Sequence, residues 1–100
     1  MTAPKAGDLL PITEHLRDAP THQARAEWLC TAPEGVILRE NLKIRDLLIR
    51  DGFEEGCDYL AVLVSKINAR RLKDGRYPAT VLMAVEMALA TMLAAARKGE

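Results

Sequence analysis

The stretch TVLMAVEMALATMLAAA, residues 80–96, carries the strongest structural signal in the chain. Its apolar residues recur at the spacing of an α-helix, and at about 100° per residue eight of them fall on one broad side. A side this wide is enough to anchor the helix in a hydrophobic core. These residues are Val81, Leu82, Val85, Ala88, Leu89, Met92, Leu93 and Ala96.

The other side of this helix should face water, yet it is also apolar. It holds Met83, Met87, Ala90 and Ala94 beside Glu86. A helix that is apolar nearly all round is either wrapped by the rest of its domain or covered by another chain. Small residues permit close helix approach, and methionine adapts to a partner surface. We therefore expect this face to contact another protein, either a second copy in a homodimer or a target, with complete wrapping by short helices as the alternative.

Four shorter helices are predicted upstream from capping residues, turn signals and apolar spacing. Thr21 and Asn41 are the expected N-caps of the second and third helices. Gly52 followed by Phe53 is typical of a Schellman motif that ends the third helix, with Phe53 folding back on Leu48. The first expected helix starts at residue 9 or 12 and ends at 19, and the third runs from its cap at residue 41 to 51. The others cover residues 22–32, 55–74 and 78–98.

The chain has the length of one ordinary domain, and it balances 14 basic against 14 acidic residues. Its one β-like run, residues 36–38, is too short for a sheet. The sequence therefore predicts an all-α fold, a compact single domain of about five helices with an orthogonal or bundle-like arrangement. We expect this domain at residues 8–100, after a flexible N-terminal arm at residues 1–7.

A basic edge is predicted on the helix at 55–74, opposite the buried stripe formed by Cys57, Leu60, Leu63, Val64 and Ile67. Acids at the start of a helix and bases at its end are also what the helix dipole favours, so a purely structural interpretation remains open. The functional interpretation is an electrostatic contact with nucleic acid or an acidic protein groove. The candidate partner-binding residues are Tyr59, Lys66, Arg70, Lys73 and Arg76.

The sequence shows no pattern typical of catalysis, metal binding or a cofactor. His15, His22, Cys30 and Cys57 have spacings that match no zinc motif, and the six glycines are scattered rather than grouped in a phosphate loop. We expect no enzyme activity, no metal and no cofactor, and two buried reduced thiols. We also expect no membrane span, because Glu86 interrupts a 17-residue alanine-rich segment.

A helix-turn-helix is the alternative function. The predicted second helix, the turn Pro33-Glu34-Gly35 and the segment 36–51 could form one, with Arg39, Lys43, Arg45 and Arg50 offered to DNA. Acidic residues are mixed among these bases, and the net charge is zero, so we expect direct sequence-specific DNA binding to be absent.

The chain resembles the small anti-CRISPR proteins of phages and mobile elements. The features that carry the resemblance are its size, its neutral charge, its alanine- and arginine-rich helices, and the segment Arg76-Tyr77-Pro78-Ala79-Thr80 that leads into the last helix. The resemblance spans the chain without a diagnostic motif. It implies a non-enzymatic inhibitor in the cytoplasm of a host bacterium. Its partners would be Cas subunits of a type I surveillance complex, type I-F first, whose binding to target DNA it would block.

Overall fold

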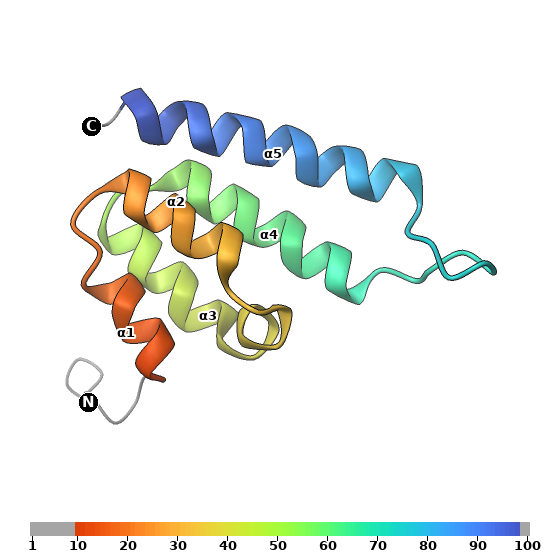
Figure 1. Ribbon diagram of the computed structural model, residues 1–100, viewed down its shortest axis with the longest axis horizontal. Helices are drawn as coiled ribbons and strands as arrows, with labels where there is room; N and C mark the ends of the chain where they lie inside the picture. The colour runs from red at the N-terminus through yellow and green to blue at the C-terminus, as the bar shows by residue number, and fades with distance from the viewer. Residues whose placement is uncertain (1–9, 99–100) are drawn as a thin grey trace.

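The computed structural model describes residues 10–98, and every regular element within them is a helix (Figure 1). The all-α, single-domain prediction is confirmed. The expected N-terminal arm at residues 1–7 lies outside the described residues. The helices are α1 (Pro11–Arg17), α2 (His22–Thr31), α3 (Glu34–Arg50), α4 (Glu54–Asn68) and α5 (Ala79–Lys98).

Helices α4 and α5 lie side by side and antiparallel, and they form the long axis of the molecule (Figure 1). Helix α3 packs on α4, α2 rests on both α4 and α5, and α1 closes against α2 and α3. The connection between α4 and α5 projects beyond the other helices at one end (Figure 1). The three N-terminal helices thus cover only one end of the α4–α5 pair.

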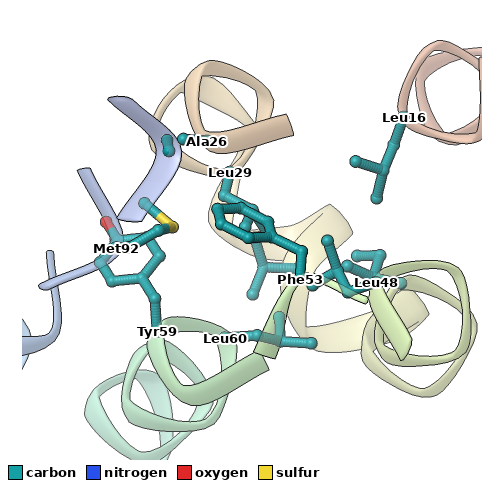
Figure 2. Packing of buried hydrophobic residues seen from close by; sticks show 11 residues of the cluster. Leu16, Ala26, Leu29, Leu48, Phe53, Tyr59, Leu60 and Met92 are labelled. Atoms are coloured by element: carbon teal, nitrogen blue, oxygen red, sulfur yellow. The ribbon is translucent and has the colours of Figure 1, made fainter. Parts of the chain in front are cut away.

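Phe53, between α3 and α4, is the largest fully buried side chain and lies at the centre of the core (Figure 2). Gly52 adopts a φ of 70°, which glycine reaches without strain. The Phe53 N–H then donates to the Leu48 carbonyl (2.9 Å) and the Gly52 N–H to the Ile49 carbonyl (3.1 Å). These are the two hydrogen bonds of a Schellman motif, so the predicted ending of the third helix is confirmed. The Phe53 ring also stacks on His22, with ring centroids 4.4 Å apart.

Two predicted helix boundaries are wrong. Helix α3 begins at Glu34 rather than Asn41, so the β-like run at 36–38 is helical, and Asn41 instead donates to the Leu38 carbonyl. Pro33 cannot continue a preceding helix, but its fixed φ suits the position immediately before a new one.

The predicted Thr21 cap is confirmed, since its Oγ1 accepts from the Ala24 N–H (3.1 Å).

The other wrong boundary is the end of α4, which lies at Asn68 and not near residue 74. Ala69 is extended, with ψ of 141°, and the chain from there to Pro78 has no helical turn. The expected stop at Gly75 is instead part of a tight turn inside the α4–α5 connection.

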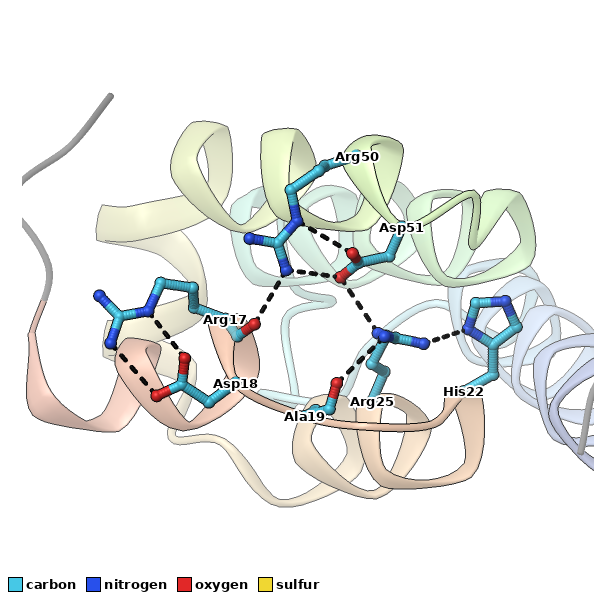
Figure 3. A network of polar contacts seen from close by, with 7 residues as sticks. All are labelled: Arg17, Asp18, Ala19, His22, Arg25, Arg50 and Asp51. Atoms are coloured by element: carbon cyan, nitrogen blue, oxygen red, sulfur yellow. Dashed lines mark hydrogen bonds and ion pairs between the residues drawn. The ribbon is translucent and has the colours of Figure 1, made fainter. Parts of the chain in front are cut away.

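A polar network fastens the ends of α1, α2 and α3 together (Figure 3). Arg25 pairs with Asp51 (3.1 Å), and its other nitrogens contact the Ala19 carbonyl (3.0 Å) and His22 Nδ1 (2.6 Å). Arg50 pairs with the same Asp51 carboxylate (2.9 Å) and donates to the Arg17 carbonyl (2.8 Å). Asp51 therefore joins two cations from different helices.

Candidate functional site

The α4–α5 connection folds into a small hairpin with a defined hydrogen-bond pattern. The Gly75 N–H donates to the Leu72 carbonyl (2.9 Å), and the Leu72 N–H donates to the Arg76 carbonyl (2.8 Å). Gly75 has a φ of 86°, which closes the turn, and Asp74 accepts from the Arg76 N–H (3.0 Å). We call residues 69–78 the basic hairpin.

Tyr77 holds the base of the basic hairpin. Two cations lie over its ring, with Lys66 Nζ 5.1 Å and the Arg71 guanidinium carbon 4.7 Å from the ring centroid. Arg71 also donates to the Tyr77 hydroxyl (3.1 Å), while Lys66 pairs with Glu34 of α3 (3.5 Å). Each cation–π contact contributes about 0.5–1 kcal/mol at an exposed position. The hairpin is thus shaped by its own side chains before any partner arrives.

The surface of the basic hairpin is strongly cationic. It carries four basic residues and one acidic residue, a net charge of +3, in a chain whose total charge is zero. Leu72 adds an exposed apolar side chain near the turn. Arg76 pairs with Asp74 (3.6 Å) in solvent, which leaves most of its charge available. The basic residues are Arg70, Arg71, Lys73 and Arg76.

The structure rearranges the predicted basic edge. Tyr59 is wrong as a partner-binding residue, because it is only 6% exposed and its ring lies beside Met92 in the core (Figure 2). Burial raises the pKa of its hydroxyl above the ordinary value. Arg70 and Lys73 are exposed, but they belong to the hairpin and not to a helix face. Lys66 remains on α4, half-buried beneath Tyr77.

The second predicted surface is on α5. Met83 and Met87 are 59% and 69% exposed, and Ala90 and Ala94 are exposed on the same side. Helix α5 packs on α4 and α2 through its opposite side, where Met92 and Ala96 are fully buried. We call Met83, Met87, Ala90 and Ala94 the methionine face.

The sequence interpretation missed a groove between α3 and α4. Two open hollows of about 460 and 240 Å³ share Arg45 and Cys57 as lining residues. Leu42 and Ile49 are exposed on the same helix, α3. Leu42 and Ile49 follow Leu38 by four and eleven residues, so all three lie on one side of a helix. This apolar spacing is visible in the sequence only if the helix begins at Glu34, and the predicted helix began later.

No group of three or more candidate metal ligands occurs in residues 10–98. The His22 ring contacts Arg25 through its Nδ1 and stacks on Phe53. Both cysteines are free, but neither is buried as expected, since Cys30 is exposed and Cys57 is half-buried. Partial burial raises the pKa of both thiols, which lowers the thiolate fraction and hence reactivity.

The helix-turn-helix residues lie on α3, but the main packing partners of α2 are α1, α4 and α5, whereas the first helix of that motif would pack mainly on the second. Several of the bases are also engaged internally. Arg39 and Lys43 both pair with the mostly buried Glu40 (3.5 Å each), and Arg50 pairs with Asp51. Arg45 is exposed beside the groove.

By length and composition alone, α5 could cross a membrane, with a mean hydropathy of 1.8 over its most apolar window. Only 11% of the residues in that window are buried in the fold.

Comparison of the chain with protein-family models, with curated proteins and with solved structures finds no match.

Proposed function

We propose that the protein is a non-enzymatic binding protein that docks its basic hairpin on an acidic protein surface and so inhibits the partner. The observation that carries the proposal is the hairpin itself, a projecting segment of net charge +3 fixed by the Tyr77 contacts. A shape set in advance reduces the entropy lost on binding.

A protein partner suits this hairpin better than a nucleic-acid backbone does. Leu72 is exposed among the bases, and Tyr77 and the arginines belong to the residue types enriched at binding hot spots. Phosphate binding uses cations and gains nothing from an exposed leucine or from Asp74. The resemblance to anti-CRISPR proteins supplies the first partner to test, Cas subunits of a type I-F surveillance complex, with inhibition through loss of target-DNA binding.

The experiment measures binding of the chain to a purified type I-F surveillance complex, together with the complex's affinity for target DNA. The test variant is the double reversal Lys73→Glu/Arg76→Glu in the hairpin. The control is Arg39→Glu/Arg45→Glu on α3, which changes the charge by the same four units. We expect the hairpin variant to lose binding at least about tenfold, since reversed charges repel an acidic surface, and the control to bind normally.

The control pair also examines the alternative function, because Arg39 and Arg45 are the residues a helix-turn-helix would offer to DNA. Sequence-specific binding of a short duplex that the α3 reversal abolishes would replace the inhibitor with the regulator. The absence of binding to any Cas subunit at micromolar concentration would refute the proposed partner. Both variants must retain their helical circular dichroism and a cooperative melt.

A further inference from the structure

The methionine face of α5 leaves more apolar surface exposed than a solvated helix requires. Met83 and Met87 are among the most exposed large apolar side chains of residues 10–98, and Ala90 and Ala94 extend the same side over three turns. A contiguous apolar face of this kind marks a contact with another molecule. The charges around it identify that molecule.

Glu86 and Arg97 lie on one flank of this face. They are eleven residues apart, which is about three helical turns, and so they project in directions that differ by only about 20°. Neither makes an ion pair or hydrogen bond with another residue of the described chain. One flank therefore carries an unpaired acid and an unpaired base at a spacing of about 16 Å.

Two antiparallel α5 helices can be related by a two-fold axis perpendicular to the plane that contains both of them. This axis places the charged flanks of the two copies on the same edge of the contact, running in opposite directions. When the axis passes between residues 91 and 92, Glu86 of each copy faces Arg97 of the other, and the pair forms twice. In a parallel arrangement the two-fold axis runs along the helices and places the two flanks on opposite edges of the contact, so Glu86 of one copy would not meet Arg97 of the other. The flank is thus complementary to itself in the antiparallel sense only.

The same register fits the apolar residues. It places Met87 of one copy over the last turns of the other α5, between Ala94 and Lys98. There the structure has an open hollow of about 530 Å³, lined by Glu55 of α4 and by Thr91, Ala94, Ala95, Arg97 and Lys98 of α5. Ala90 and Ala94 lie near the axis, where small side chains let the two helices approach closely. Charge pairing and the fit of Met87 into the hollow therefore require the same alignment.

From these observations we infer that the protein forms an isologous homodimer in which two α5 helices pack antiparallel through their methionine faces. Because the chain has a net charge of zero, two copies do not repel each other as they approach. The contact spans one helix per copy, which is at the small end of interface sizes, so the dimer dissociates on dilution. The inference does not depend on the proposed inhibitor function.

The test is sedimentation equilibrium over a concentration series, with 11.0 kDa as the monomer mass. Met87→Glu should shift the dissociation constant upward at least about tenfold, because it places a charge in the apolar contact. Leu42→Glu on α3 is the matched control, because Leu42 is 68% exposed and Met87 is 69% exposed. The control should dimerise like the parent.

The charge pairs give the sharper experiment. Glu86→Arg alone should weaken self-association, since Arg then faces Arg97 twice, and Arg97→Glu alone should weaken it through two facing acids. An equimolar mixture of these two variants should form a heterodimer, because each copy then offers the charge that the other needs. Failure of the mixture to associate, while each variant stays folded, overturns the antiparallel register.

Three other results would also overturn the inference. One is a parent protein that remains monomeric up to millimolar concentration. Another is a dimer lost in Leu42→Glu and retained in Met87→Glu, which would place the contact on α3. The third is flotation of a monomeric protein with vesicles of equal parts phosphatidylcholine and phosphatidylglycerol, abolished by Met87→Glu, which would assign the face to a membrane surface.

Discussion

Gly56, in the first turns of α4, lies against the ring of Phe53 with no room for a side chain. A Cβ at this position would be 2.6 Å from Phe53 Cδ2 and 2.9 Å from Cε2. Phe53 is fully buried and cannot withdraw. We expect Gly56→Ala to lower the free energy of unfolding by about 1–2 kcal/mol, because overpacking outweighs the better helix propensity of alanine.

Gly35 provides the matched control, since it is also helical and a Cβ there would have nothing within 4 Å. Gly35→Ala should raise the free energy of unfolding by about 0.5 kcal/mol. Urea denaturation of the two variants measures both values. Equal effects of the same sign would contradict the packing around Phe53.

Thr13 of α1 is fully buried, and its hydroxyl has no hydrogen-bond partner among residues 10–98. Thr13→Val replaces that hydroxyl with a methyl group of similar size and keeps the β-branched shape. We expect the free energy of unfolding to rise by about 1 kcal/mol, because the desolvation cost of the hydroxyl disappears. Thr31→Val is the control: Thr31 is exposed and donates to the Glu27 carbonyl (2.9 Å), so its thermal melt should show no gain.

At the scale of the elements, the helices whose ends depend on local chemistry were predictable. The Thr21 cap and the Gly52-Phe53 ending require only neighbouring residues, and both are found. The end of α4 was not predictable in this way, because residues 69–74 contain good helix formers. The chain leaves the helix there to place Tyr77 against Lys66 and Arg71, a contact between residues up to eleven positions apart.

The basic hairpin should therefore lose its order when Tyr77 is removed. We expect Tyr77→Ala to speed trypsin cleavage at Arg70 and Arg71 several-fold, since cleavage follows local opening. Tyr77→Phe keeps the ring beneath both cations and loses only the hydroxyl contact with Arg71, so it should stay close to the parent rate. Similar rates for parent and Tyr77→Ala would show that the ring does not hold the hairpin. Gel densitometry over time gives the rates.

At the scale of the whole molecule, Asp51 connects helices that have few other contacts. Its hydrogen bond with Arg50, helped by the charge of Arg25, lowers the pKa of the carboxyl below its ordinary value of 3.8. A lowered folded-state pKa stabilises the fold fully above about pH 4, and that stability is lost as the pH falls through the folded pKa. We expect the free energy of unfolding to decline steeply below pH 4.

Asp51→Asn should flatten that acidic decline and lower stability at neutral pH by about 2 kcal/mol. The side chains of Arg25 and Asp51 are only 11% and 15% exposed, so the substitution leaves a largely buried cation without its counterion. Asp18→Asn removes an exposed pair with Arg17 and should leave stability at neutral pH nearly unchanged. Denaturant titrations from pH 2 to 7 compare the variants.

The candidate surfaces differ in how far sequence could locate them. The methionine face follows from periodicity alone, and its residues are exposed on one side of α5. The basic residues were identified as a group, but their arrangement was assigned to a helix, because a hairpin needs the Tyr77 contact. Tyr59 was misplaced because position 59 borders both the buried and the exposed side of α4, and its ring is buried beside Met92 of α5 (Figure 2).

Because the basic hairpin lies outside the core, the residues that would bind a partner are separate from the residues that stabilise the fold. Substitutions at Arg70, Lys73 or Arg76 alter what the tip presents without disturbing Phe53 or the Schellman turn. Substitutions at these three positions can therefore change the binding preference at little cost to folding, whereas substitutions around the buried Phe53 cannot. Homologues should accordingly diverge faster at positions 70, 73 and 76 than at Arg71 and Gly75, which hold the hairpin in shape.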